Sequence, residues 1–120
     1  GVDVVFAAAG GSGTGVYQAA KDDGKLAIGV DSNQNHLQPG VMLTSMLKRV
    51  DVAVYNALKA HKPGVTVLGL KEGGVDVALD EHNAKLITPA MLSKVDAVKA
   101  DIIRGKIKVA DFTDNASCTY

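Results

Sequence analysis

Aromatic side chains and excess charge are both scarce in this sequence. It has no tryptophan, and aromatic residues make up only 4% of the chain. Its 13 Lys and Arg residues balance 13 Asp and Glu residues, so the formal net charge is zero. Proteins that bind nucleic acids usually stack bases on aromatic rings and carry a basic surplus. We therefore expect no nucleic-acid partner.

Cysteine is almost absent too, since Cys118 is the only one. A lone cysteine cannot form an internal disulfide, and we interpret it as an incidental residue of the tail. The three histidines, His36, His61 and His82, show neither an HExxH motif nor i,i+4 spacing. A GxSxG motif and a histidine close to Cys118 are also missing. These absences predict a protein without a metal site or cofactor that is not an enzyme.

Long hydrophobic runs are missing as well. No apolar run approaches the ~20 residues that a membrane-spanning helix needs, and no signal peptide is visible at the N-terminus. The sequence starts directly on an apolar run, residues 2–9, without a polar lead-in. We interpret this abrupt start as a sign that the chain is part of a longer protein. In that case the missing signal peptide would not bear on where the protein works.

What remains is a composition typical of one globular domain, with 47% hydrophobic and 22% charged residues in a chain of 120. Short apolar runs bounded by turn formers predict strands at 2–9, 25–31, 41–43, 65–70, 75–79 and 107–109. Apolar residues at helical spacing predict helices at 14–23, 45–61 and 88–104. Two of these helices should bury a stripe, formed by Met46, Val50, Val54, Ala57 and Leu58 in one and by Met91, Val95, Val98 and Ile102 in the other.

The alternation of strands and helices predicts an open α/β fold, a parallel sheet with flanking helices. Ligands of such sheets bind beyond the carboxyl ends of the strands. Two predicted loops would lie there, residues 10–15 and residues 31–40.

The first of these loops reads GGSGTG, and four glycines in six positions need a physical reason. Glycine lets a ligand approach the backbone closely, and the N–H groups that open the following helix attract oxygen lone pairs or negative charge. We predict that Gly10, Gly11 and Ser12 bind a ligand. The alternative is a tight turn that packs the helix on the strand. The spacing completes neither a dinucleotide-binding fingerprint nor a P-loop.

The second loop begins with Asp31, roughly twenty residues after the glycines. A carboxylate at that place can accept two hydrogen bonds from a ribose diol. The alternative is an aspartate that caps its own loop. Asn33, Gln34 and Asn35 follow, either to cap the loop or to contact a polar ligand.

Lys71 follows the predicted strand at 65–70 and stands beside Glu72 and two glycines. A lysine at a strand end can reach into a cleft, and we count Lys71 as a candidate ligand-binding residue. The alternative is a solvated surface pair of Lys71 and Glu72.

Five segments now carry a family resemblance. In chain order they are VDVVFAAAGGSGTGVYQAAK, AIGVDSNQ, LTSMLKRVDVAVYNALK, LGLKEGGV and ITPAMLSKVDAVKADIIRGKIKV. Together they resemble the basic membrane protein (Bmp, PnrA-like) family, the substrate-binding lipoproteins of ABC transporters that include purine-nucleoside receptors. The resemblance runs from Val2 to about Asp111, and it matches only the later part of such a protein.

The resemblance implies one lobe of a two-lobed type I periplasmic binding protein. Residues 1–111 would form the C-terminal lobe, with a hinge crossing at about 65–83, and residues 112–120 a polar tail. Asp31 would bind ribose hydroxyls, Lys71 would contact the ligand near the hinge, and Gly10 and Gly11 would line the cleft. Many members of the family have an acidic residue where this chain has Asn33.

The same resemblance implies partners and a location. The ligand would be a small molecule, a purine nucleoside or similar ribose-containing compound, and the membrane permease of an ABC transporter would receive it. The protein would work in the periplasm or on the outer face of the cytoplasmic membrane, lipid-anchored through an N-terminus that this chain lacks. The N-terminal lobe is missing too, so an isolated C-terminal lobe would expose apolar surface and self-associate.

Two other functions stay open at this point. The GGSGTG loop and Asp31 would also suit a small Rossmann-like domain that binds a nucleotide cofactor in an enzyme, although the incomplete fingerprint counts against it. A sensory or regulatory protein that uses the same lobe is the other alternative.

Overall fold

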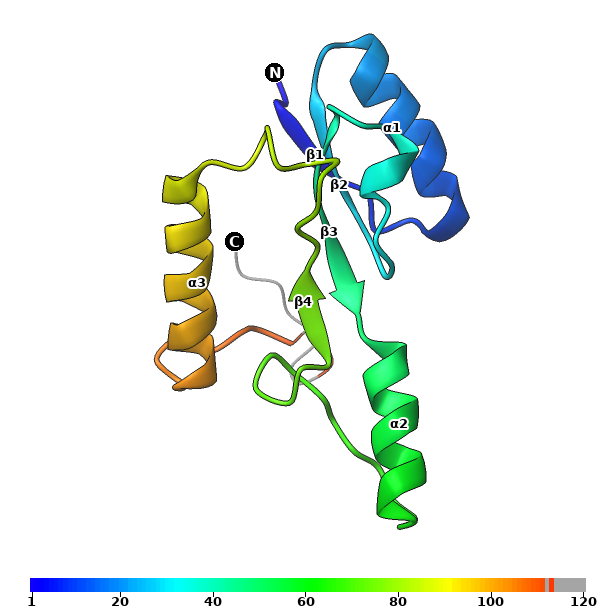
Figure 1. Ribbon diagram of the computed structural model, residues 1–120, viewed down its shortest axis with the longest axis vertical. Helices are drawn as coiled ribbons and strands as arrows, with labels where there is room; N and C mark the ends of the chain where they lie inside the picture. Colours follow the sequence, from blue (N-terminus) through cyan, green and yellow to red (C-terminus); the bar gives the residue numbers. More distant parts are fainter. Residues whose placement is uncertain (112, 114–120) are drawn as a thin grey trace.

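Figure 1 shows the computed structural model of the chain, which describes residues 1–111 and 113. Four strands form one open sheet in the order β1-β2-β3-β4, with bounds Val4–Phe6, Leu26–Gly29, Met42–Lys48 and Val75–Val77. The first three strands are parallel, and β4 pairs antiparallel with β3 at the edge. The expected α/β class, an open sheet with flanking helices, is confirmed, and the antiparallel strand makes the sheet a mixed one.

Three helices surround this sheet, α1 (Gly13–Asp22), α2 (Val50–Ala60) and α3 (Pro89–Ile103). Figure 1 shows α1 against β1 and β2, α2 projecting beyond the end of β3, and α3 on the opposite side of the sheet from α1. Two short 3-10 helices, η1 (Gly10–Ser12) and η2 (Asn35–Leu37), follow β1 and β2. The chain therefore repeats a strand–loop–helix order that places loops at the carboxyl end of each parallel strand.

The predicted boundaries of α1 and α3 agree with the structure to within a residue or two. Gly24 follows α1 at φ +63°, a left-handed backbone that glycine adopts without steric cost. At the start of α3, the Thr88 hydroxyl accepts a hydrogen bond from the Met91 amide at 3.2 Å, and Pro89 occupies the first helical position. Local sequence signals thus define both helices.

The core of the described chain is small and lies between α1 and the sheet. Tyr17 and Ala20 of α1 are buried against residues that belong to or border the first three strands, namely Ala7, Ala27, Val41 and Met42. The stripes predicted for the other two helices were wrong. Met46 lies in β3 rather than in a helix, and α2 and α3, described over their full lengths, contain no buried residue.

Two of the predicted strands were also wrong. Residues 65–70 form an irregular segment that pairs with no strand of the described chain, and Val65 and Val67 are 97% and 85% exposed. Residues 107–109 are irregular as well. An alternating apolar pattern yields a strand only where a neighbouring strand supplies hydrogen-bond partners, and the described residues supply none here.

The predicted helix at 45–61 begins five residues too early. Residues 45–48 belong to β3, which extends well past the short strand predicted at 41–43. This stretch pairs with β2 on one side and with β4 on the other, for example Lys48 with Val75. The helix begins only at Val50, after the ladder ends.

Some earlier expectations fall outside the described residues. The tail at 112–120, apart from Thr113, and Cys118 within it belong to this group. In the part of the chain that the structure describes, no helix combines the length and hydrophobicity needed to span a bilayer.

Gly29, the last residue of β2, has a packing role that can be tested. A Cβ at this position would lie 2.5 Å from the Ser45 Oγ and 3.0 Å from the Gln34 side chain. We expect Gly29→Ala to lower the free energy of unfolding by about 1–3 kcal/mol, because overpacking forces its neighbours to move. Chemical denaturation of the two proteins measures this difference.

The matched control is Gly15→Ala in α1, where an added Cβ meets nothing within 4 Å. This substitution should be neutral or stabilise the chain by up to about 1 kcal/mol, because alanine is the better helix former. Equal stability of the two variants would contradict the close packing described for Gly29.

Candidate functional site

The carboxyl ends of the three parallel strands meet at one edge of the sheet, and the candidate residues lie along it. Gly10, Gly11 and Ser12 form η1 after β1, and Asp31 follows β2. Lys71 stands in the turn just before β4, and because β4 is antiparallel, its start lies beside the end of β3. The topology thus brings all five candidates to the same edge.

An open pocket of about 430 Å³ lies at this edge, where β2 and β3 end. Asp31 is the one candidate that lines it, and the other four lie elsewhere along the edge. The remaining lining residues come from the loop after β2 and from the junction of β3 and α2, namely Ser32, Asn33, Leu47, Lys48, Arg49, Val50 and Asp51.

Asp31 is held in an unusual backbone conformation, with φ at +68°. Its carbonyl oxygen accepts a hydrogen bond from the Lys48 amide at 2.8 Å, and its carboxylate lies 3.0 Å from the Lys48 Nζ. Both side chains are about half exposed, at 51% for Asp31 and 58% for Lys48. An ion pair this exposed stabilises the fold by at most about 1 kcal/mol, so a ligand can displace it at little cost.

A second ion pair neutralises the other charges of the pocket. The Arg49 guanidinium donates from Nε and Nη2 to the Asp51 carboxylate, at 3.0 and 2.8 Å. This hydrogen bonding lowers the pKa of Asp51 to about 2 and raises the pKa of Arg49. The four charged side chains that line the pocket therefore form two neutral pairs, an arrangement that suits an uncharged polar ligand better than an anion.

The glycine loop is open on its outer side. A Cβ built on Gly10 or Gly11 meets nothing within 4 Å, whereas one on Gly13 would lie 3.1 Å from the Tyr17 hydroxyl. Close packing thus accounts for Gly13, and a φ of +54° accounts for Gly10. Neither reason applies to Gly11. The space above Gly11 is free of protein atoms to at least 4 Å from a Cβ built there.

Lys71 lies on an exposed turn that is packed against the end of β3. The Gly74 carbonyl accepts from the Arg49 amide at 2.8 Å, which brings the turn to the strand. Glu72 accepts a hydrogen bond from the Gly69 amide at 2.9 Å, so its carboxylate stabilises the turn. Lys71 and Glu72 do not form the surface ion pair that was the alternative, since no ion pair joins them among the described side chains.

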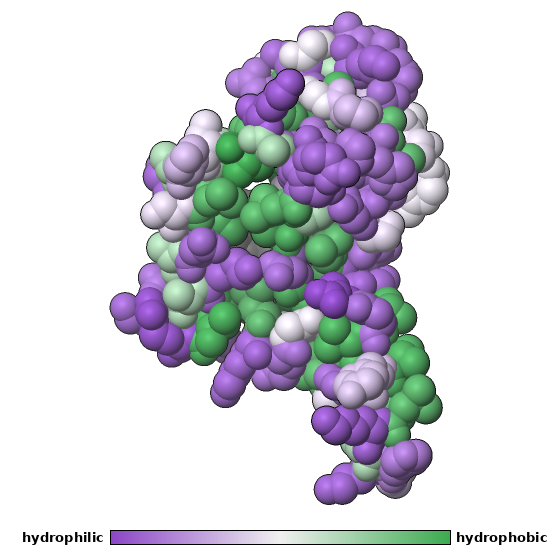
Figure 2. Space-filling view, viewed as in Figure 1, coloured by the Kyte–Doolittle hydropathy of each residue, from purple (hydrophilic) through white to green (hydrophobic). Residues whose placement is uncertain are grey.

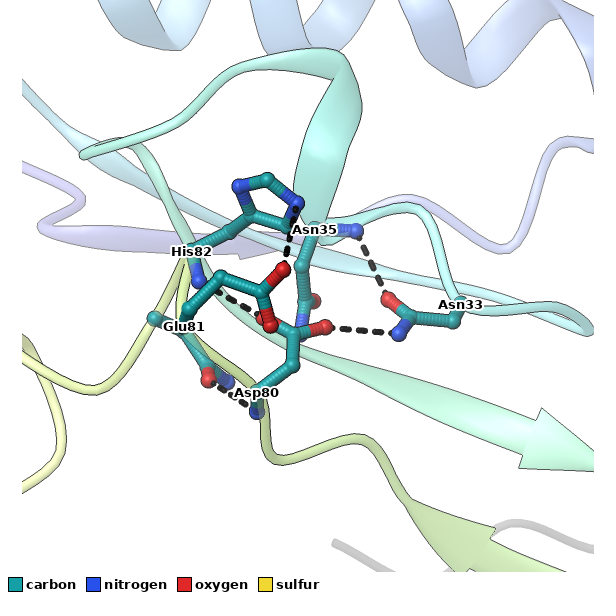
Figure 3. Close-up of polar contacts among 6 residues, drawn as sticks. Asn33, Asn35, Asp80, Glu81 and His82 are labelled. Atoms are coloured by element: carbon teal, nitrogen blue, oxygen red, sulfur yellow. Dashed lines mark hydrogen bonds and ion pairs between the residues drawn. The ribbon is translucent and has the colours of Figure 1, made fainter.

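The polar residues after Asp31 take part in a hydrogen-bond network that is exposed at Asn33 and buried at Asn35, and whose distant partners the sequence analysis missed (Figure 3). Asn33 and Asn35 both donate to the Asp80 carboxylate, which lies 45 or more residues further along the chain, at 2.6 and 3.1 Å. The Asn35 amide oxygen accepts from the Ser45 hydroxyl at 2.8 Å, and both residues are completely buried. These residues hold the loop internally. The cluster Asn-Gln-Asn before a strand was a signal for it, but the partner Asp80 was not identifiable from spacing.

The histidines do not form a metal site. The rings of His36 and His82 approach to 6.5 Å between centroids. Within residues 1–111 and 113, however, no three His, Cys, Asp or Glu side chains are grouped closely enough to hold a metal ion.

Comparison with known proteins identifies the family. A family model described as "ABC transporter substrate-binding protein PnrA-like" (Bmp) matches residues 1–113. The chain belongs to the Bmp family. The description of this family is that of substrate-binding proteins.

Individual relatives agree with this Bmp assignment. The chain is 40% identical to Basic membrane protein D of Borreliella burgdorferi, covering 91% of this chain and 34% of that protein. It is 37% identical to the ABC transporter nucleoside-binding protein BmpA of Lactococcus lactis, covering 91% of this chain and 36% of that protein. An uncharacterized lipoprotein of Pyrococcus abyssi is 42% identical over 62% of the chain. The Bmp chain therefore spans about one third of the length of the curated relatives that match most of it.

A solved structure supports the fold. The Bmp chain superimposes on an ABC-transporter solute-binding protein from Aeropyrum pernix with a TM-score of 0.75 at 29% identity. The match covers 92% of this chain and 40% of the solved one.

The left-handed backbone at Asp31 leads to a prediction. Asp31→Val should be less stable than Asp31→Gly by about 1–2 kcal/mol, because a branched side chain is strained at positive φ and glycine is not. Both variants lose the Lys48 ion pair equally, so the comparison isolates the backbone. Urea unfolding of both variants measures the difference, and equal midpoints would show that the positive φ is not maintained.

Proposed function

We propose that this chain is the ligand-binding C-terminal lobe of a longer substrate-binding protein that delivers a purine nucleoside, or a similar ribose-containing compound, to an ABC importer. Residues 1–111 would form the lobe and residues 65–83 a crossing to the other lobe. The observation that carries the proposal is the pocket at the ends of β2 and β3, where Asp31 lies in a lining whose charges are balanced.

A nucleoside fits this pocket chemically. It has no net charge, so it needs no surplus of lysine or arginine. Its ribose diol offers two donors at a spacing that one carboxylate can accept, and each such charge-assisted bond contributes roughly 1.5–3 kcal/mol. The diol would take the place of the Lys48 ammonium at Asp31. Gly10, Gly11 and Ser12 would contribute backbone N–H groups and a hydroxyl, and Lys71 would reach the ligand from the crossing.

The exposed apolar surface of the chain supports a second lobe. Val50, Val54 and Leu58 on α2 are 53%, 53% and 65% exposed. Together with residues 62–68, α2 borders a groove of about 580 Å³. Figure 2 shows apolar residues over α2 and between α3 and the sheet. We propose that the rest of the longer protein covers these faces.

The family also suggests where the protein works. We propose an extracytoplasmic location with a lipid anchor on the part of the protein that precedes this chain, and a membrane permease as partner. The lipoprotein relatives in two Pyrococcus species support this location.

The proposal predicts saturable binding of adenosine, guanosine or inosine by the longer protein in calorimetric titration. Asp31→Ala should weaken that binding at least tenfold, because two charge-assisted acceptors are lost. Asp22→Ala is the control, since it removes an exposed carboxylate of α1 whose partner is Gln18. If the longer protein binds none of the three nucleosides but binds another solute, the nucleoside assignment is wrong, whereas the fold assignment is unaffected.

The same instrument tests the cofactor-domain alternative. Under our proposal NAD produces no heat in a titration of the 120-residue chain. Saturable NAD binding that disappears in Asp31→Ala would support a cofactor domain of an enzyme instead.

The exposed faces predict self-association of the 120-residue chain. Sedimentation velocity at rising concentration should show dimers or larger species, because association removes exposed apolar surface from water. Val54→Lys combined with Leu58→Lys should shift the chain towards monomer. Ser93→Lys, which adds charge at an exposed position of α3, should not. A monomeric wild-type chain would contradict the prediction.

A further inference from the structure

Asp80, in the segment between β4 and α3, is a point where several hydrogen bonds converge (Figure 3). One carboxylate oxygen accepts from Asn33 at 2.6 Å and from Asn35 at 3.1 Å, and the other accepts from the His82 amide at 2.8 Å. The hydrogen bond from Asn33, aided by those from His82 and Asn35, holds the pKa of Asp80 below its usual value. The Asp80 carboxylate is therefore ionised at neutral pH and can only accept hydrogen bonds.

On the other side of these bonds lies the loop that carries Asp31. The Asn33 side-chain oxygen accepts from the Asn35 amide at 3.0 Å, which closes a tight turn. The backbone N–H of Gln34 donates a hydrogen bond to the Ser45 hydroxyl oxygen at 3.0 Å. The Gln34 side-chain oxygen in turn accepts from the Val30 amide at 2.9 Å, so the backbone on each side of Asp31 is fixed.

The network helps to maintain the backbone conformation of Asp31. Its φ of +68° lies in the left-handed region, which aspartate tolerates better than most residues with a side chain but less well than glycine. Residues 33–35 and Val30 lie around Asp31. Among the described residues beyond β3, Asp80 is the one whose side chain bonds to them.

We propose that Asp80 is a positioning residue of the binding site, which holds the Asp31 carboxylate at the pocket by anchoring Asn33 and Asn35. This inference rests on the proposed function, since it assigns Asp80 a part in ligand binding. Asp80 touches no ligand in this scheme. It also links the ligand loop to the segment that follows β4, so the loop and the proposed crossing move together.

The short contact between Asn33 and Asp80 allows a charge-based test. Asn33→Asp removes the donor and places two carboxylates in contact, which repel each other. Asp80→Asn in the same chain relieves this repulsion and restores a donor opposite the new carboxylate, although the Asn35 side-chain amide then loses the acceptor that it shares with Asn33. A positioning contact therefore predicts damage in Asn33→Asp and partial recovery in the double variant. For measurements on the 120-residue chain, the control is Asn56→Asp, the same change at a position of α2 that is exposed there.

Hydrogen exchange in the 120-residue chain gives a readout that needs no ligand. The Lys48 amide bonded to the Asp31 carbonyl reports the loop, and the Asp23 amide bonded to Ala19 reports α1. We expect Asn33→Asp to lower protection at Lys48 about tenfold with little change at Asp23, because only the loop opens. The double variant should recover part of this loss, because the repulsion is removed but the bond from Asn35 is not restored.

The second readout is adenosine affinity in the longer protein. Asn33→Asp should weaken binding about tenfold, and Asp80→Asn in the double variant should restore part of that affinity. Protection at Lys48 and Asp23 that falls equally, or a double variant no better than Asn33→Asp, would overturn the positioning role. If the wild-type longer protein binds no nucleoside, the proposed function is wrong. The role of the Asn33–Asp80 contact in the loop is still tested, because hydrogen exchange measures it without a ligand.

Discussion

A buried hydrogen-bond network that joins the loop after β2 to β3 and to the segment after β4 is the constraint on which the rest of this structure depends. Asn35, Ser45 and Asn83 are completely buried, and a buried polar group without a partner would destabilise the chain by roughly 1–3 kcal/mol. Among the described residues, no buried side-chain nitrogen or oxygen lacks a partner. Asn83 donates to the carbonyls of Leu43 and Ala78, so the same network also ties β3 to the end of β4. In a chain with so small an apolar core, these directional bonds fix the relative positions of the loops.

The network matters for function because it surrounds Asp31, a pocket residue with a left-handed backbone. Asp31 lies between Val30, held by Gln34, and Asn33, held by Asp80. Its carboxylate is half exposed and paired with the half-exposed Lys48 side chain rather than with the network. Hydrogen bonds thus hold the backbone around Asp31, whereas a ligand could displace the ion pair that its carboxylate forms with Lys48. The balanced charges of Arg49 and Asp51 beside it make the pocket neutral, which is the property that a nucleoside requires.

The sequence predicted the elements whose signals are local and failed where a distant partner decides. Thr88 and Pro89 define the start of α3 without reference to any other element, and Gly24 ends α1 in the same way. Residues 45–48 carry helical spacing, yet they form strand because β2 and β4 supply hydrogen bonds on both sides. Residues 65–70 carry strand spacing, yet they pair with nothing in the described chain. The exposed residues of α2 have the same origin, since an apolar stripe predicts burial only when a covering surface exists.

By itself, the sequence determined the fold class, the glycine loop, the family and the candidacy of Asp31, because each depends on residue types at fixed spacing along the chain. Only the tertiary structure decided that Asp31 has a positive φ, that Lys48 pairs with its carboxylate, and that Asp80 reaches the loop after β2. Asn33 and Asp80 are 47 residues apart, and no pattern within either segment specifies the other. Their contact follows from the order of the strands in the sheet, which brings the two loops together after β3 has been placed between β2 and β4.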